Sequence, residues 1–262
     1  MSGICPGCKQ EKELFALRKC TPKCDNCTCE QIGKQFMNIF RKSTIELKKQ
    51  TLNILVAVSG GPCSMFAYTI LTERVDTKRP GKSNAIRKIE PISTKDLDLP
   101  NLHHIDKFTV KNIVDYAEKN DFNCIVFGDS MDFITLKSLG YISLGRPDLL
   151  PYIAGNDLTT YKNVAIFRPA RTLLTSELKF WCDVHHVSTI NEKSLLQKEF
   201  EVEKHMLDNI IADGNDTTVY SVQSMGEKMP NTKYTEKCPV CGLPAETSES
   251  PCAICLVEAK SI

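Results

Sequence analysis

The amino-acid sequence predicts an α/β protein: a parallel sheet with helices on both faces, flanked by N- and C-terminal zinc ribbons of four cysteines each. Three observations predict this class. An apolar run at residues 54–58 leads into a Gly-Gly turn and then into a helical pattern. Further short apolar runs alternate with helical patterns, which is typical of parallel sheets with right-handed crossovers. Two pairs of Cys-x-x-Cys motifs bracket this region.

Length and composition predict one sizeable domain with small appendages. The chain has 262 residues, 42% of them hydrophobic, and a formal net charge of +1, so charge alone neither favours nor excludes nucleic acid. No apolar run reaches transmembrane length, and residues 1–12 are polar and unlike a signal peptide. We therefore expect a soluble cytoplasmic protein without membrane contact.

Residues 1–29 predict an N-terminal zinc ribbon. Two Cys-x-x-Cys pairs lie fifteen residues apart there, and thirteen cysteines in a chain without an export signal favour metal over disulfides. The preferred ligands are Cys5, Cys8, Cys24 and Cys27. Cys20 and Cys29 are competing ligands, and the preference rests only on the repeated two-residue gap.

The C-terminal part predicts a second site of four cysteines. Its two Cys-x-x-Cys pairs lie ten residues apart, with prolines between them. The predicted ligands are Cys238, Cys241, Cys252 and Cys255. The spacing again favours structural zinc.

Between the ribbons the chain divides into three predicted parts. Residues 30–50 form a connecting helix whose basic residues either face solvent or contact RNA phosphates. Residues 51–215 form the α/β domain, and residues 216–262 form a linker and the second ribbon. The expected strands are residues 54–58, 85–93, 124–127 and 164–167, and the expected helices are residues 64–75, 109–120, 131–139, 177–181 and 191–213. Residues 214–237 are expected to form a turn followed by a polar stretch.

The loop after the first strand is the candidate nucleotide site. Paired glycines at the start of a helix let a phosphate approach backbone N–H groups without a Cβ in the way. The candidate cofactor-binding residues are Ser59, Gly60, Gly61, Ser64, Gly128 and Asp129. The last two follow another strand, and loops at the carboxyl ends of parallel strands face one crevice. Asp129 either holds a ribose or an ion, or it or Ser130 caps the next helix.

Arginines and histidines supply further candidates. Arg146, Arg168 and Arg171 follow elements that feed the same sheet edge, so they are candidates for phosphate contact with nucleotide or RNA. Salt bridges within the protein account for them equally well. The pairs at residues 103–104 and 185–186 lack the spacing of a catalytic zinc site, so surface or core histidines are favoured.

The loop sequence SGGPCS resembles the SGGxDS signature of the PP-loop ATP pyrophosphatases, and departs from it twice. Cys63 replaces the aspartate, and Pro62 occupies a position often held by lysine. Proline lacks an N–H group and a thiol is a poor ligand for a hard cation, which disfavours ATP binding by this loop. Alternatively, Pro62 simply starts the helix and Cys63 is a small buried residue.

Several blocks extend the resemblance along the chain. They are CPGC, CDNC, VAVSGGPCSM, CIVFGDSMDFITLKSLGYISLGRP, FRPARTLLTSELKFW, CPVCGLP and CAIC. In this order they resemble the cytoplasmic tRNA 2-thiolation protein 2 family, the second subunit of the eukaryotic complex that thiolates the wobble uridine of tRNA.

This resemblance implies a tRNA-binding subunit required for the 2-thio group of mcm5s2U in tRNAs for lysine, glutamate and glutamine. It implies a heterodimer with a catalytic PP-loop paralogue that takes sulfur from a thiocarboxylated ubiquitin-related modifier, and hence a link to protein urmylation. The chain lacks both the loop aspartate and a Cys-x-x-Cys in its central part, which favours a non-catalytic role.

Two alternative functions stay open at the level of sequence. In the first, the chain is an active ATP-dependent thiouridine synthase that uses Cys63 as a persulfide carrier. In the second, it is a zinc-ribbon scaffold that binds proteins and no RNA. A salt-dependent interaction with tRNA separates the second alternative from the family function.

Overall fold

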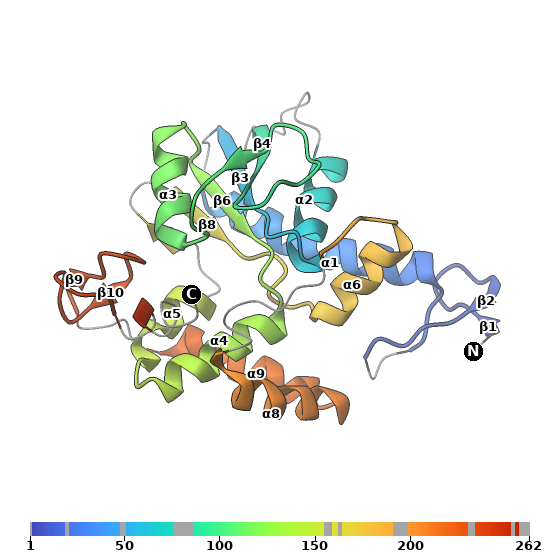
Figure 1. Ribbon diagram of the computed structural model, residues 1–262. Helices are drawn as coiled ribbons and strands as arrows, with labels where there is room; N and C mark the ends of the chain where they lie inside the picture. Colours follow the sequence, from blue (N-terminus) through green and yellow to red (C-terminus); the bar gives the residue numbers. More distant parts are fainter. Residues whose placement is uncertain are drawn as a thin grey trace.

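The computed structural model describes residues 2–18, 21–47, 51–75, 86–154, 159–161, 164–190, 199–229, 234–252 and 255–256. Its centre is a six-stranded sheet of order β5-β4-β3-β6-β8-β7 (Figure 1). The strands are β3 (Leu52–Ala57), β4 (Ile86–Ser93), β5 (His103–His104), β6 (Cys124–Phe127), β7 (Thr159–Tyr161) and β8 (Val164–Phe167). Five strands are parallel, and β7 runs antiparallel to β8 at one edge.

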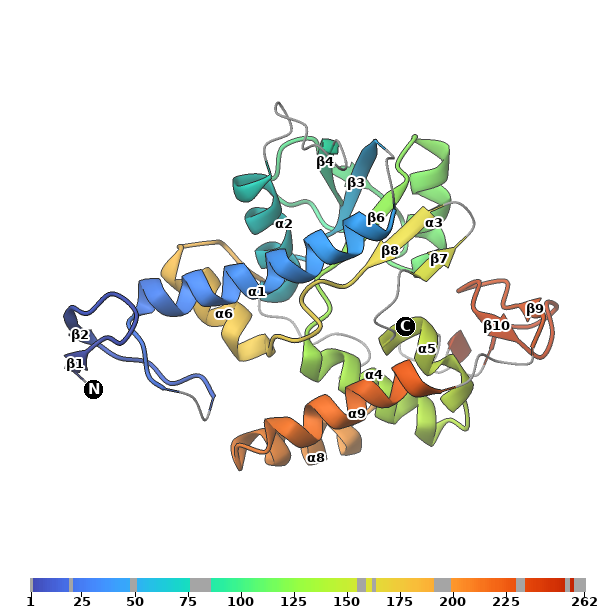
Figure 2. The same ribbon diagram turned by 180° about the vertical axis from the view of Figure 1, so that it is seen from behind.

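Helices cover both faces of this sheet, as the sequence predicts. The helices α1 (Asp25–Glu46), α2 (Pro62–Arg74) and α6 (Thr175–Val184) lie on one face, and α3 (Val110–Lys119) lies on the other (Figure 2). Alternate residues of β3 supply the two cores: Ile54 and Val56 face the first group, and Leu55 and Ala57 face α3. The period-two pleat therefore divides one apolar strand between two hydrophobic layers.

Aromatic side chains join the three helices of the first face. The ring of Phe66 on α2 meets Phe36 of α1 edge-on at 5.2 Å and Trp181 of α6 edge-on at 4.9 Å. All three side chains are fully buried. Edge-to-face pairs of this kind add to the burial of apolar area, so α1 belongs to the main core.

A separate group of helices lies beside the sheet. It contains α4 (Met131–Ser143), the 3-10 helix η1 (Pro147–Leu149), α5 (Leu150–Ala154), α8 (Glu201–Ala212) and α9 (Asp216–Lys228). In Figures 1 and 2, α8 and α9 lie side by side against α4. Met131, Phe200, Leu207 and Val219 share one buried cluster among these helices.

The sequence prediction is wrong for residues 216–228, which form α9 in place of a polar stretch. The buried positions of α9 are Val219, Gln223 and Gly226, so helical periodicity exists but only one of the three residues is apolar. Packing against α4 stabilises the helix, and Thr135 donates a hydrogen bond to the Val219 carbonyl at 3.1 Å. The expected helix at residues 191–213 is observed as α8, and residues 191–198 lie outside the described part of the chain.

Other predicted elements are confirmed. The strands at residues 124–127 and 164–167 have the predicted bounds, and the strand at residues 85–93 is observed as β4. Thr109 caps α3, because its side chain accepts a hydrogen bond from Asn112 N at 3.2 Å. No helix within the described residues is long and apolar enough to cross a bilayer.

A small hairpin lies at each end of the molecule (Figures 1 and 2). The first pairs β1 (Ser2–Ile4) with β2 (Glu11–Glu13), and the second pairs β9 (Glu236–Lys237) with β10 (Pro244–Ala245). The predicted domain limits at residues 29, 50 and 215 stay predictions, although α1 begins inside the first predicted ribbon.

We predict that Gly128→Ala is strongly destabilising. A Cβ at this position would lie 2.7 Å from the Cys63 carbonyl carbon and 2.8 Å from Ser64 Cα, both backbone atoms at the start of α2. Relieving that clash requires β6 and α2 to separate, at a cost of about 1–3 kcal/mol in the free energy of unfolding measured by urea denaturation. Gly61→Ala is the matched control, because its nearest neighbour is 3.7 Å away. Equal losses for the two variants would contradict the tight contact.

Candidate functional site

The candidate phosphate loop joins β3 to α2 and is tied together by its own serines. Ser59 N donates to Ser64 Oγ at 3.2 Å, and Ser64 Oγ donates to the Gly61 carbonyl at 3.0 Å. Gly60 has φ +86°, a conformation that favours glycine. Pro62 occupies the first turn of α2, where its missing N–H costs little. The loop keeps the strand–turn–helix form, but its Ser59 N–H is already used.

A distant segment covers the same loop. Ile190 N donates to the Gly60 carbonyl at 2.7 Å. A Cβ at Gly60 would lie 2.8 Å from Ile190 Cδ1 and 3.3 Å from Leu97 Cδ2, so two apolar side chains pack over this glycine. Ile190 and Leu97 thus pack over one side of the loop, and Pro62 contributes no N–H group to it.

Cys63 lies where the loop meets α6. Its Sγ is 3.6 Å from Thr175 Oγ1, which in turn lies 2.8 Å from Ser130 Oγ. Burial, reinforced by the negative charge of Asp132, raises the pKa of Cys63 to about 12. The thiol is therefore protonated at neutral pH, whereas cysteine nucleophiles and persulfide carriers react as thiolates.

The second predicted loop does meet the first. Gly128 lies directly against the backbone of Cys63 and Ser64, so the loops that follow β3 and β6 lie together at one edge of the sheet. Ser130 is the N-cap residue of α4 but makes no side-chain capping bond.

Asp129 is held by two cations. Its Oδ2 lies 3.1 Å from Lys137 Nζ and 3.2 Å from Arg168 Nε, and its side chain is 12% exposed. Burial acts to raise the pKa of Asp129, but the charges of Lys137 and Arg168 outweigh it and lower the pKa overall. The carboxylate is thus already committed to partners within the protein.

The other two candidate arginines are also buried. Arg146 makes two hydrogen bonds of 2.9 Å to the carboxylate of Asp148, and donates to the Pro244 carbonyl at 2.8 Å. Its hydrogen bonds to Asp148 raise the pKa of Arg146 despite the burial. Arg171 is 8% exposed. For Arg146 and Arg168 the structure thus favours the salt-bridge interpretation over an RNA contact.

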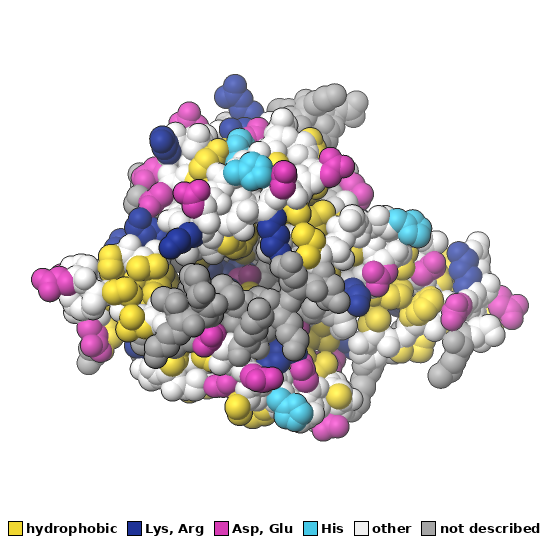
Figure 3. Space-filling model, viewed as in Figure 1, with side chains coloured by type: hydrophobic (Ala, Val, Ile, Leu, Met, Phe, Trp, Pro, Cys, Tyr) yellow, Lys and Arg dark blue, Asp and Glu magenta, His cyan; other side chains and the backbone are white. Residues whose placement is uncertain are grey.

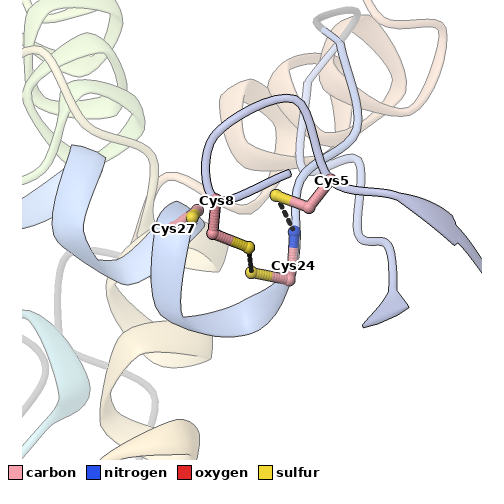
Figure 4. Close-up of side chains that lie close together, drawn as sticks. All are labelled: Cys5, Cys8, Cys24 and Cys27. Carbon is pink, nitrogen blue, oxygen red and sulfur yellow. Dashed lines mark hydrogen bonds between the residues drawn. The ribbon is translucent and has the colours of Figure 1, made fainter. Parts of the chain in front are cut away.

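The N-terminal cysteine set converges on one point (Figure 4). The sulfur atoms of Cys5, Cys8, Cys24 and Cys27 all lie within 4.8 Å of one another. Cys8 and Cys24 are 3.8 Å apart, and Cys24 N donates to Cys5 Sγ at 3.3 Å. Of the two competing ligands, Cys29 packs in the main core, and Cys20 lies outside the described residues.

The C-terminal set has the same geometry. The sulfur atoms of Cys238, Cys241, Cys252 and Cys255 also lie within 4.8 Å of one another, with two pairs at 3.8 and 3.7 Å. A tetrahedron with metal–sulfur distances of about 2.3 Å has edges of about 3.8 Å, far longer than the S–S bond of about 2.05 Å in a disulfide. Each set therefore fits one tetrahedral ion.

The histidine pairs have other partners. His103 bridges Glu90, at 2.7 Å from Nε2, and the Tyr116 hydroxyl, at 2.8 Å from Nδ1. His185 stacks on Trp181 with ring centroids 3.9 Å apart. Neither pair belongs to a metal-binding group among the described residues.

Sequence reasoning missed the residues that close the loop. Ile190 and Leu97 are far from Gly60 in the chain, and no local motif links them to it. Lys137 was also missed, although its place two turns into α4 puts it over Asp129 at the start of that helix.

We predict that Asp129 stabilises the fold in a pH-dependent way. Because the pKa of Asp129 is lowered on folding, its contribution is complete above the unfolded value of about 3.9 and is lost as the pH falls through the folded pKa. Asp129→Asn should cost about 3 kcal/mol in the free energy of unfolding at pH 7, and less below pH about 4. Asp208→Asn, at a half-exposed ion pair, should change little at either pH. A loss for Asp129→Asn that is independent of pH would refute the assignment.

Comparison with known proteins shows which sequences this chain resembles. No protein-family model matches the chain. It is 26% identical over 148 residues to a cytoplasmic tRNA 2-thiolation protein 2 of Xenopus tropicalis, covering 52% of this chain and 29% of that protein. It is 26% identical over 140 residues to the protein of that name in Schizosaccharomyces pombe, covering 52% of this chain and 38% of that protein. The chain therefore matches well under half the length of either relative.

A solved structure extends the likeness to the whole fold. It is the U34-tRNA thiolase NcsA from Methanococcus maripaludis with its [4Fe-4S] cluster, at a TM-score of 0.65 and 12% identity. The superposition covers 98% of this chain and 95% of NcsA. Over about half of its own 262 residues, the chain is thus a distant homologue of cytoplasmic tRNA 2-thiolation protein 2. Its α/β fold is that of a PP-loop-like thiolase.

Proposed function

We propose that this chain takes part in 2-thiolation of the wobble uridine in tRNAs for lysine, glutamate and glutamine as a non-catalytic, tRNA-binding subunit. The similarity to cytoplasmic tRNA 2-thiolation protein 2 supports the pathway. The observation that carries the non-catalytic role is the phosphate loop, which keeps its backbone form while Ile190 covers Gly60.

The chemistry of thiolation explains why this observation matters. The 2-oxygen of uracil is a poor leaving group until it is adenylated, and adenylation requires ATP phosphates held by backbone donors and a metal. Here Pro62 offers no N–H, the Ser59 N–H is used within the loop, and Cys63 stands where the signature has its aspartate. We infer that ATP is bound by a catalytic PP-loop paralogue in a heterodimer.

The raised pKa values of the thiols in the central domain also support a non-catalytic role. Sulfur transfer needs a thiolate or a thiocarboxylate, but burial raises the pKa of Cys63 and of Cys182 to about 12, and raises that of Cys124 well above its usual value. We infer that the sulfur comes from the paralogue, which takes it from a ubiquitin-related modifier. This disfavours the alternative of an active synthase that uses Cys63.

We further propose that each cysteine set holds a structural zinc ion in the cytoplasm. Both sets offer four thiolates at the spacing of one tetrahedral ion and leave no position for a substrate or water. A single zinc fits this geometry better than a [4Fe-4S] cluster, whose four cysteines bind four separate irons and lie farther apart. The ion would supply folding energy to segments with few apolar residues.

Zinc analysis tests the ligand assignment. We expect about two zinc ions per chain by plasma emission spectroscopy, one for each cysteine set. Cys8→Ser or Cys252→Ser should each reduce this to about one, because a serine hydroxyl does not replace a thiolate. Cys63→Ser is the control and should keep both ions. Two zinc ions retained in Cys252→Ser, or iron in place of zinc, would rule out the proposed site.

Thiolation of tRNA transcripts tests the function. Single-turnover reactions would contain ATP, a sulfur donor, and this chain, the catalytic paralogue, or both. We expect full activity only from the mixture, and a change of less than about twofold for Cys63→Ala, because its thiol is protonated.

Two outcomes would contradict the proposal. If this chain thiolates tRNA alone and Cys63→Ala abolishes the product, it is an active synthase. If the mixture needs this chain but the chain shows no salt-dependent binding of tRNA, it is a protein scaffold, since phosphate contacts always depend on salt.

A further inference from the structure

We propose that tRNA contacts this chain in a groove beside the N-terminal cysteine cluster, with phosphates at Lys23, Lys34 and Arg74 and an unstacked base on His185. The inference rests on the proposed function, which makes RNA the ligand. The structure indicates where on the protein the RNA would bind. Arg146 and Arg168 are poor candidates, because both are already bonded to carboxylates inside the protein.

The groove lies where four parts of the fold meet. It has a volume of about 770 Å³ and lies between the cluster residue Cys27, the first turns of α1, the end of α2 and the end of α6. In Figure 2, α1 and α6 run side by side toward the N-terminal hairpin, and α2 lies next to them, farther from the hairpin. Its size suits a nucleotide, and its lining is rich in long polar side chains.

The charges of the groove leave cations available. Arg74 and Lys34 share one carboxylate, that of Glu30, at 2.8 and 3.6 Å. Lys23 donates to the neutral amide of Gln31 at 2.6 Å. The Lys34 side chain is 68% exposed, whereas those of Arg146 and Arg168 are 9% and 7% exposed. Three cations against one carboxylate give this wall an excess of positive charge.

The face drawn in Figure 3 offers no comparable basic groove among its described residues. On the face drawn in Figure 3, cationic and anionic side chains are interspersed, as expected from a net charge of +1. Hydrophobic side chains gather there over the C-terminal module, where Val240 is 41% and Leu256 49% exposed. We therefore favour the basic groove as the RNA site over this face, where charges of both signs are mixed.

His185 adds an aromatic platform. Its ring is nearly parallel to that of Trp181, with an interplanar angle of 14° and centroids 3.9 Å apart. Trp181 is fully buried, while His185 is exposed and lines the groove. One face of the imidazole is thus fixed by the indole, and the ring is held flat at the groove wall. Flat aromatic surfaces beside cations are how proteins hold unstacked bases of single-stranded RNA loops.

The basic character continues along α1. Arg41 and Lys42 are exposed, about two turns beyond Lys34, which corresponds to a rise of about 11 Å along the helix axis. This direction leads from the groove along the helix that packs on the sheet, and gives the RNA backbone a path beyond the first nucleotide.

Binding of a tRNA transcript to the full chain, measured by fluorescence anisotropy at several salt concentrations, tests the groove. We expect Lys34→Ala and Lys23→Ala each to weaken binding about fivefold, and to reduce the slope of log K against log salt by about one. Lys119→Ala, which removes an exposed lysine of α3 on the opposite face of the sheet, is the matched control and should change neither.

The platform needs a different pair of variants. His185→Leu keeps Trp181 covered but removes the aromatic face, so we expect about tenfold weaker binding with an unchanged salt slope. His185→Phe keeps a flat ring and should restore most of the affinity. A merely structural role for this position would not distinguish leucine from phenylalanine in this way.

The outcomes separate this inference from the function on which it rests. No salt-dependent binding by the unaltered chain would refute the proposed tRNA-binding function itself. Strong binding that the groove variants share equally with Lys119→Ala would refute the groove alone. Zinc content is measured for every variant, and a loss of zinc in Lys23→Ala or Lys34→Ala would assign these lysines to the cysteine cluster and overturn the RNA contact.

Discussion

The close approach of β6 to the start of α2 is the constraint on which the rest of this site depends. Gly128 lies against the backbone of Cys63 and Ser64, where no side chain fits. Because β3 and β6 are neighbouring parallel strands, this contact fixes the two loops at one edge of the sheet. The Ser130 and Thr175 hydroxyls and the Cys63 thiol then meet within hydrogen-bonding distance. Backbone packing thus fixes the position of both loops independently of the chemistry of their side chains.

Because backbone packing fixes the loop, its conformation does not depend on which reactive side chains it carries. Under the proposed function, the loop residues serve the fold: Pro62 starts a helix, and Ile190 packs over Gly60. Asp129 is neutralised by Lys137 and Arg168. A fold alone does not specify an activity, and here the contacts made by individual side chains argue for a supporting role.

The features that could be predicted from the sequence are those set by residues close together in the chain. Each Cys-x-x-Cys pair forms a turn within a few residues, so the two cysteine sets were predictable from spacing. The inner strands β3, β6 and β8 were predictable because they are short, apolar and buried. The parallel edge strand β5 was not predicted, because it consists only of His103 and His104. Ile190 was not predictable, because its contact with Gly60 spans 130 residues. The helix α9 was not predicted, because Gln223 and Gly226 occupy its buried face and the sequence therefore shows no apolar residues at helical spacing there.

Hydrogen bonds from arginine side chains tie both cysteine modules to the rest of the molecule. Arg18 donates to the Thr172 carbonyl at 2.8 Å and pairs with Glu177 of α6, while Arg146 links η1 to Pro244 in the second hairpin. The N-terminal cluster also supplies Cys27 to the groove that we assign to RNA. A metal ion that fixes Cys27 therefore fixes one wall of that groove, and RNA affinity becomes coupled to the presence of the ion even though the ion itself touches no RNA.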